Sequence, residues 1–185
     1  WVAWNLACYS VGGIWVPIYS NQSNDYCNHI INDCNPKLFI TNNKSQNMDN
    51  TRTILNTVHK SNKHFNIEDT NSLATLIYTS GTTGSPKGVK LTHNNIVSNI
   101  ESIKYRFSDL QNYKTVNILP WAHIYSLTCE LYYNLLNVNE TYICNDKTTF
   151  IEDCKTIRPN AVFLVPKILE LVKNKVEFLD KPYIR

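Results

Sequence analysis

The residues best suited to chemistry lie in one short loop, residues 79–88. It holds three of the chain's five glycines, several hydroxyl side chains and one lysine, but no carboxylate. Glycine permits a positive φ and lets backbone N–H groups approach a ligand, and N–H groups, hydroxyls and an ammonium bind anions. The loop therefore predicts a site for a polyanion, and a phosphate chain fits best. The expected binding residues are Thr79, Ser80, Gly81, Thr82, Thr83, Gly84, Ser85, Lys87 and Gly88.

The spacing in this loop differs from that of the common nucleotide-binding loops. The P-loop requires Gly-x4-Gly-Lys-Ser/Thr ahead of a helix, whereas here Pro86 precedes Lys87 and a strand-like segment follows Gly88. The Gly-x-Gly-x-x-Gly pattern of dinucleotide-binding proteins is also absent. We therefore expect a hairpin of two strands around the loop, with no helix N-terminus as the main anchor of the anion. A plain surface turn without a ligand is the alternative.

The elements that must position the loop alternate between helices and strands, which predicts an α/β fold with a sheet covered by helices. Residues 1–43 are expected to form a helix at 1–11 and then a parallel βαβ unit, with Ser23 capping its helix. Residues 44–71 are a polar, Asn-rich connection, and residues 72–185 carry the loop. The expected strands are 14–19, 37–41, 73–78, 89–92, 116–119, 141–144 and 161–165, and the later helices are 94–106, 125–136, 150–157 and 168–178.

Composition excludes several classes of protein. The chain is 43% hydrophobic and 18% charged, so it can fill a core, and its net charge of +3 is too small and too scattered to indicate a nucleic-acid partner. The six cysteines form no C-x-x-C pair or zinc pattern, which favours reduced thiols in an intracellular protein. Neither His59 nor His64 has a further ligand at metal-binding spacing. Residues 1–24 are uncharged, but Pro17 and Gly12–Gly13 interrupt them, so a buried helix and strand are favoured over a membrane span.

Residues 77–89 (IYTSGTTGSPKGV) resemble the phosphate-binding loop of the adenylate-forming, or AMP-binding, superfamily of acyl-CoA synthetases, luciferases and peptide-synthetase adenylation domains. Residues 119–125 (LPWAHIY) resemble the second motif of that family. Residues 158–170 (RPNAVFLVPKILE) and 12–19 (GGIWVPIY) are similar to its long-chain fatty-acid–CoA ligase branch. The resemblance covers nearly the whole chain except residues 42–71. It implies the fold of part of the large N-terminal domain of such an enzyme.

Two departures from the family pattern stand out. Lys167 occupies a position where the long-chain branch usually has arginine, which weakens any bidentate contact there. Asn137 and Asn139 lie in a turn where the family tends to have glycine. Asparagine tolerates the left-handed conformation, so we expect the turn to form.

The resemblance implies a two-step reaction in which ATP activates a long-chain fatty acid to an acyl-adenylate and CoA then takes up the acyl group. It implies ATP, Mg²⁺ and CoA as cofactor and co-substrates, and a location in the cytoplasm or on the endoplasmic reticulum surface, with the protein associated with the membrane. By resemblance, Lys87 and His123 are catalytic, Thr79 is linked to Mg²⁺, and His123 lies near the α-phosphate and the substrate carboxylate. The alternative for His123 is packing at the start of an apolar helix. Residues 127–136 are interpreted as core, with an acyl pocket as the alternative.

Two other functions stay open. One is a different adenylate-forming ligase, of the peptide-synthetase or luciferase type, and the other is a non-catalytic nucleotide-binding module. The chain begins at Trp1 rather than methionine, and we expect it to be an internal piece of the N-terminal domain. The adenine and ribose motifs of the family, and the catalytic lysine of its smaller C-terminal domain, do not occur in it. We therefore expect the chain alone to bind ATP weakly and not to turn over.

Overall fold

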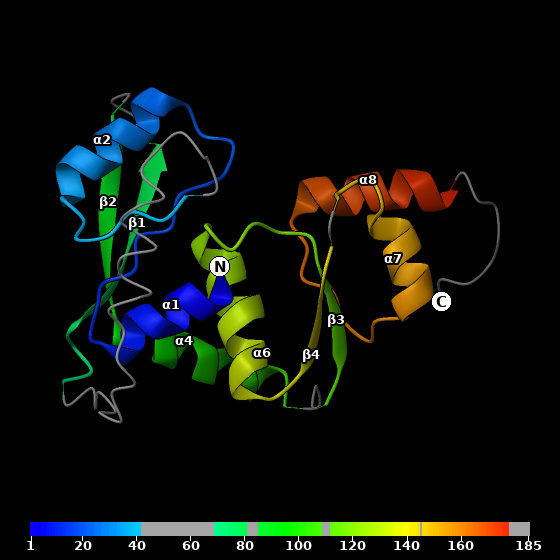
Figure 1. The fold of residues 1–185 in the computed structure, drawn as a ribbon. Coiled ribbons are helices and arrows are strands. Elements are labelled where there is room, and N and C mark those ends of the chain that lie inside the picture. Colours follow the sequence, from blue (N-terminus) through cyan, green and yellow to red (C-terminus); the bar gives the residue numbers. More distant parts are fainter. Residues whose placement is uncertain (42–68, 81–84, 109–111, 145, 178–185) are drawn as a thin grey trace. The chain divides into compact units, whose positions relative to one another are not determined.

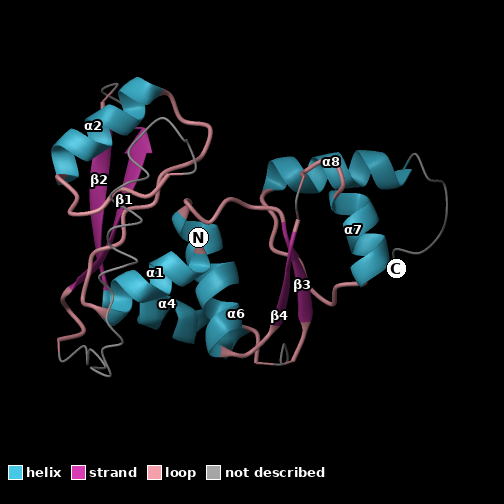
Figure 2. Cartoon of the chain, in the orientation of Figure 1, coloured by secondary structure: helices cyan, strands magenta, loops and turns pink. Residues whose placement is uncertain are grey.

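The computed structural model describes residues 1–41, 69–80, 85–108, 112–144 and 146–177 (Figure 1). The described residues form both helices and strands, which alternate from β2 to α7, and this confirms the α/β class (Figure 2). The chain divides into two compact units, residues 1–93 and 94–185, and each is described by itself. His59, His64 and most of the polar connection at residues 44–71 lie outside the described residues.

The first unit contains helices α1 (Val2–Ser10) and α2 (Asn24–Cys34) and strands β1 (Leu73–Ser80) and β2 (Pro86–Thr92). Ser23 caps α2 as expected, since its Oγ accepts a hydrogen bond from the Tyr26 backbone N–H at 3.2 Å. Strands β1 and β2 form an antiparallel hairpin, so the expected strand–loop–strand arrangement is confirmed.

The expected βαβ unit at residues 14–41 is wrong in its strands. The helix forms, but neither 14–19 nor 37–41 is a strand. Trp15 alone forms a parallel bridge to Thr75, with two hydrogen bonds of 2.9 Å to the backbone of β1. The next ladder bond on this edge would come from the N–H of residue 17. That residue is Pro17, which has no N–H, so the ladder stops after one residue.

The second unit does contain a βαβ unit. Strand β3 (Lys114–Asn117) pairs in parallel with β4 (Glu140–Ile143), and a helical crossover joins them. The crossover consists of α5 (Ile124–Ser126), the π-helical η1 (Leu127–Tyr132) and α6 (Tyr133–Leu136). Helix α4 (His93–Arg106) precedes this βαβ unit, and α7 (Phe150–Ile157) and α8 (Pro166–Glu177) follow it.

The expected strand at residues 161–165 is reduced to one bridge, between Ala161 and Thr115. Strand β3 ends only two residues after Thr115, so little of its edge remains for a longer ladder. Pro166 opens α8, as expected.

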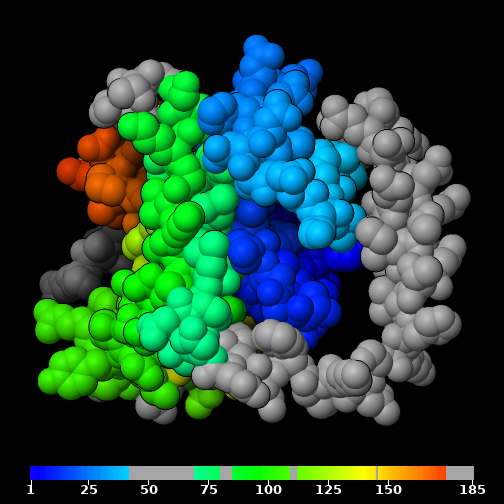
Figure 3. All heavy atoms as spheres, turned by 90° about the vertical axis from the view of Figure 1, so that its left-hand side faces the viewer, coloured from blue at the N-terminus to red at the C-terminus, as the bar shows by residue number. Residues whose placement is uncertain are grey.

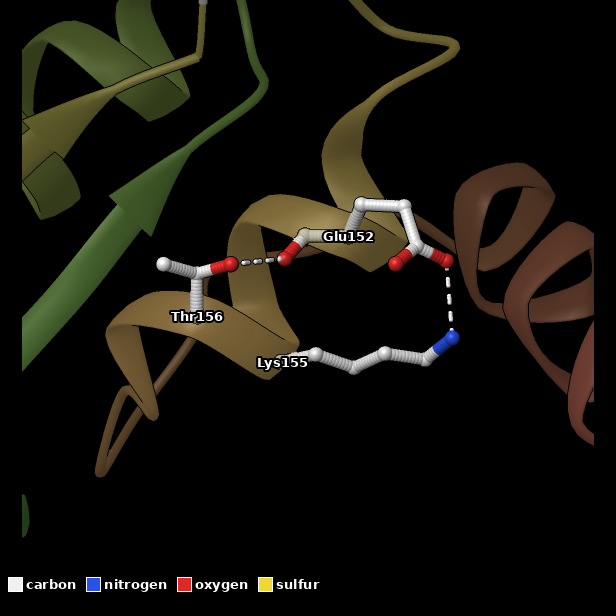
Figure 4. Close-up of polar contacts among 3 residues, drawn as sticks. All are labelled: Glu152, Lys155 and Thr156. Atoms are coloured by element: carbon white, nitrogen blue, oxygen red, sulfur yellow. Dashed lines mark hydrogen bonds and ion pairs between the residues drawn. The ribbon is translucent and has the colours of Figure 1, made fainter.

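The core of the second unit lies between β3 and α7. Val116, Ile118, Leu119 and Phe150 are buried together there. The outer face of α7 is polar, and it carries an exposed ion pair in which Lys155 Nζ lies 2.7 Å from Glu152 Oε1 (Figure 4). Thr156 Oγ1 donates to the Glu152 carbonyl at 3.0 Å. Such exposed pairs contribute little to stability, so burial of the inner face is what holds α7 in place.

The turn before β4 differs from expectation in one residue. Val138, rather than Asn137 or Asn139, has the left-handed backbone, with φ of 55°. A β-branched residue is strained in this conformation, and Val138 is 86% exposed, so packing offers no compensation.

Two other expectations concern the cysteines and membrane spans. All six cysteines are free thiols, as expected. None of the helices in the described part of the chain is long and apolar enough to span a membrane.

Candidate active site

The hairpin brings together two of the residues predicted to bind phosphate. Thr79 and Lys87 are directly opposite one another in the β1–β2 register, and both are exposed. Side chains opposite one another in an antiparallel pair point to the same face, with Cβ atoms about 4.5–5.5 Å apart. A hydroxyl and an ammonium therefore share one face at the loop end of the hairpin. Ser85, exposed, directly precedes β2, whereas Gly81, Thr82, Thr83, Gly84 and the Ser80 side chain lie outside the described residues.

Gly88 matters to the hairpin because it lacks a Cβ atom, and not because it adopts an unusual backbone conformation. Among the described glycines only Gly12 has a positive φ, so Gly88 does not use the positive φ that glycine permits. Gly88 lies opposite Tyr78 in β1. A Cβ atom on Gly88 would lie 3.1 Å from Leu76 Cδ1 and 3.2 Å from Tyr78 Cζ, which is tighter than ordinary contact. Glycine here lets the Tyr78 ring lie against the neighbouring strand.

Helix α2 is hydrogen-bonded to both strands that lead into the loop. Tyr78 Oη of β1 donates to Asp33 Oδ2 at 2.5 Å, and His29 Nε2 donates to the carbonyl of Pro86, the first residue of β2, at 3.0 Å. His29 and Asp33 are four residues apart and so lie on one face of α2. The space-filling view shows α2 lying against the hairpin (Figure 3). Burial first, and then the bond to Asp33, raises the pKa of Tyr78, so this phenol stays a donor.

Side-chain directions separate the α2 contact from the face that carries Thr79 and Lys87. Tyr78 faces α2, and because successive residues of a strand point to opposite faces, Thr79 and Lys87 lie on the other face. The α2 contact therefore supports the loop from behind. Sequence reasoning missed it, although the i,i+4 spacing of His29 and Asp33 was a usable signal.

His123 lies in the connection between β3 and α5. Loops at the carboxyl end of a parallel strand are where α/β proteins place ligand-binding groups. The side chain is exposed and caps α5, since its Nδ1 accepts a hydrogen bond from the Tyr125 backbone N–H at 3.2 Å. An accepting Nδ1 carries no proton, so the neutral ring carries its proton on Nε2. His123 therefore presents an N–H donor at Nε2, and its ring is not packed in the core.

Below His123, the helical crossover buries a carboxyl group. Glu130 in η1 is fully buried, and its Oε2 accepts hydrogen bonds from Asn117 Nδ2 and from Trp121 Nε1, the latter at 3.2 Å. Burial raises the pKa of Glu130 to about 7, against the lowering effect of the two donors. Sequence reasoning missed Glu130 as well. The signal was available, because it is the only charged side chain between Lys114 and Glu140.

The apolar residues of the crossover form core. Leu127, Leu131 and Tyr133 are buried, whereas Tyr125 and Leu136 are exposed. The described residues contain no cluster of three His, Cys, Asp or Glu side chains that could hold a metal ion. A divalent cation at the hairpin would therefore take its ligands from hydroxyls, phosphate oxygens and water. Lys87 belongs to the first unit and His123 to the second.

Comparison with known protein families gives one match that spans nearly the whole chain. Residues 1–183 match the family described as AMP-binding enzyme. Among curated proteins, the chain is 35% identical over 100 residues to long chain acyl-CoA synthetase 6, peroxisomal, of Arabidopsis thaliana, which covers 52% of this chain and 14% of that protein. It is 32% identical over 123 residues to the long-chain-fatty-acid–CoA ligase heimdall of Drosophila melanogaster, covering 62% of this chain and 18% of that protein. The matched part is thus less than a fifth of either relative.

Among solved structures, the chain is similar to O-succinylbenzoate coenzyme A synthetase (MenE) of Bacillus subtilis in complex with ATP and a magnesium ion. The TM-score is 0.71 at 20% identity, covering 91% of this chain and 37% of that one. At this identity the likeness concerns the fold.

Proposed function

The chain belongs to the family of AMP-binding enzymes, and we propose that the protein activates a long-chain fatty acid with ATP, first to an acyl-adenylate and then to acyl-CoA. The observation that carries the proposal is the β1–β2 hairpin, which places Thr79 and Lys87 on one face beside a glycine-rich loop. A face with a hydroxyl, a cation and no carboxylate suits a triphosphate. The relative solved with ATP and Mg²⁺ shares this fold and supports ATP as the substrate.

In the first step a carboxylate oxygen of the acid attacks the α-phosphorus of ATP. A P–O bond to the acid forms, the bond to pyrophosphate breaks, and negative charge grows on the departing pyrophosphate. The Lys87 ammonium and the N–H and hydroxyl donors of the loop stabilise that charge as it develops. The family resemblance assigns His123, whose Nδ1 accepts from Tyr125, a hydrogen bond from Nε2 to the oxygens around the α-phosphorus.

In the second step the thiol sulfur of CoA attacks the acyl carbon. The thioester bond forms, AMP leaves with the bonding electron pair, and the thiol proton is released. The chemistry of the Thr79 site also fits Mg²⁺, which prefers hard oxygen ligands and keeps several from phosphates and water. Mg²⁺, when bound, would neutralise charge on the phosphates, and the exposed Thr79 hydroxyl at the loop end of β1 is the residue that would hold it.

A long-chain fatty acid is proposed as the acid for two reasons. Residues 158–170 are similar to the long-chain branch, and both curated relatives carry long-chain acids in their names. The competing proposal is another acid within the same reaction class, which the resemblance in fold to an O-succinylbenzoate ligase keeps open.

The test is acid-dependent exchange of pyrophosphate into ATP by the full-length protein, measured with acids of graded chain length. We expect exchange with long-chain acids. Lys87→Ala should lower kcat/KM roughly 5- to 150-fold. This corresponds to a loss of about 1–3 kcal/mol of transition-state stabilisation, because a charge-assisted contact is lost. Lys90→Ala is the matched control, since Lys90 is also exposed on β2 but points to the opposite face. Absence of exchange with every fatty acid, or an equal loss in both variants, would overturn the proposal.

A further inference from the structure

We propose that Glu130 is a positioning residue: its buried carboxyl fixes the turn that carries His123, and so sets the direction of the His123 ring. The consequence for catalysis rests on the proposed function, whereas the effect on the turn does not. Neither the family resemblance nor the relatives' names assign a role to this side chain.

The carboxyl of Glu130 joins three parts of the second unit. Its Oε2 accepts from Asn117 at the end of β3 and from Trp121 in the following loop, while its own backbone belongs to η1. Asn117 Nδ2 also donates to the Leu119 carbonyl at 2.8 Å. This one carboxyl oxygen therefore links the end of β3, the following loop and η1.

A short series of hydrogen bonds leads from this point to His123. The His123 backbone N–H donates to the Pro120 carbonyl at 3.0 Å. Ser126 Oγ is bonded to the same Pro120 carbonyl and to the His123 carbonyl, the latter at 3.2 Å. The turn is therefore held by Asn117, Trp121 and Glu130 on one side and by Ser126 on the other. Loss of the hydrogen bonds to Glu130 should make residues 119–122 more mobile. These residues determine the position of His123 at the start of α5.

A carboxyl group at this place is costly for the fold. Glu130 Oε1 is buried and has no hydrogen-bond partner among the described residues. A buried, half-satisfied carboxyl destabilises a protein where an apolar side chain would not. It also lies on a π-helical segment, a feature that occurs frequently at functional sites. Local sacrifices of stability of this kind are typical of functional sites.

Among the described groups that interact electrostatically with Glu130, none changes its charge near pH 7. Tyr113, Tyr125 and Cys129 interact with it electrostatically, and burial raises the pKa of each, so all three are neutral near pH 7. The ionised carboxylate accepts hydrogen bonds more strongly than the acid. With a pKa of about 7, Glu130 should hold the turn more firmly at pH 8 than at pH 6.

The first test measures the turn itself, by amide hydrogen exchange at pH 8 in the full-length protein. Glu130→Gln should accelerate exchange of the peptide covering residues 119–127 at least threefold. The matched control is Thr128→Val, a nearly isosteric change at another buried polar residue of η1. This control should leave exchange of that peptide unchanged. Equal exchange in the wild type and Glu130→Gln, or equal acceleration in both variants, would overturn the proposal whatever the substrate.

The second test measures catalysis, as pyrophosphate exchange with the best acid. Glu130→Gln should lower kcat about tenfold at pH 8 with KM for ATP within twofold, as expected for a misplaced reacting group. At pH 6 the difference in kcat should shrink to less than threefold, and Thr128→Val should stay within twofold at both values. A pH-independent loss, or a loss confined to KM, would contradict a positioning role. If the wild type is inactive with every acid, the proposed function fails, and hydrogen exchange still decides whether Glu130 fixes the turn.

Discussion

His123 combines a structural and a chemical role, and two substitutions can separate them. Its Nδ1 caps α5, and its Nε2 is the proposed donor to substrate. Asparagine is a good helix cap but lacks an imidazole N–H, whereas alanine supplies neither.

We therefore expect His123→Asn and His123→Ala to lose kcat alike, by about 10²-fold, while only His123→Ala loses about 1 kcal/mol of stability. Steady-state kinetics and denaturant unfolding of the same preparations measure the two effects. Full activity in His123→Asn would show that the ring acts only as a cap.

Glu130 predicts an unusual dependence of stability on pH. Its folded pKa of about 7 lies above the ordinary value of 4.5, so between these values the folded state binds a proton that the unfolded state has released. The free energy of unfolding therefore falls as pH rises through this window, by about 1.4 kcal/mol per pH unit at most. Glutamine cannot ionise and escapes this loss.

The expected result is that Glu130→Gln gains about 2–3 kcal/mol over the wild type between pH 5 and pH 8. Denaturant midpoints of both proteins at the two pH values measure it, with the exposed Glu101→Gln as the control. A constant difference between Glu130→Gln and the wild type would contradict the raised pKa. This gain in stability runs opposite to the expected loosening of the turn, so general unfolding cannot imitate the local effect.

Among the elements, α2 is hydrogen-bonded to both strands of the hairpin, and we expect it to hold the hairpin in place. The Tyr78 hydroxyl of β1 donates a hydrogen bond to the Asp33 carboxylate of α2. A double-mutant cycle of Tyr78→Phe and Asp33→Asn should give a coupling of about 1.5–3 kcal/mol, the usual range for a bond to a charged group.

Both single variants should also raise KM for ATP, because the loop loses its support from behind. The control pair is Tyr78→Phe with Asp25→Asn, an exposed residue in the first turn of α2. Coupling near zero for Tyr78 and Asp33 would mean that α2 does not hold the hairpin.

The strands show where sequence patterns fall short. Residues 73–80 and 86–92 were predictable as a hairpin, because apolar residues flank a loop rich in glycine and hydroxyl residues. Residues 14–19 are equally apolar but form only the Trp15 bridge. Residues 73–80 have β2 as a pairing partner along their length, whereas Pro17 stops the pairing of residues 14–19 with β1. A strand exists only where a neighbouring strand edge can form hydrogen bonds with it.

At the scale of the whole molecule, the described sheets are small. The β1–β2 and β3–β4 pairs each have two strands, and such pairs are marginally stable alone. Large apolar side chains next to β4 and within it are exposed, including Leu136 at 65% and Ile143 at 60%. The part of the chain that matches its curated relatives also covers less than a fifth of either one.

We therefore expect the 185-residue chain expressed alone to bind ATP weakly and to form no thioester, whereas the full-length protein should bind ATP more tightly and form the thioester. Calorimetric titration with ATP and a thioester assay with fatty acid, ATP and CoA compare the two. Thioester formation by the chain alone would contradict this expectation.

The sequence by itself determined the family, the β1–β2 hairpin around the glycine-rich loop and the helices of the α/β fold. These follow from local signals: residue types at fixed spacing, caps such as Ser23 and Pro166, and apolar periodicity. The tertiary structure alone decided that Thr79 faces Lys87, that α2 is bonded to the hairpin, and that Glu130 is buried beneath the His123 turn. Each of these features joins separate elements or depends on burial. Local spacing in the sequence does not indicate which groups the folded chain brings into contact or removes from water.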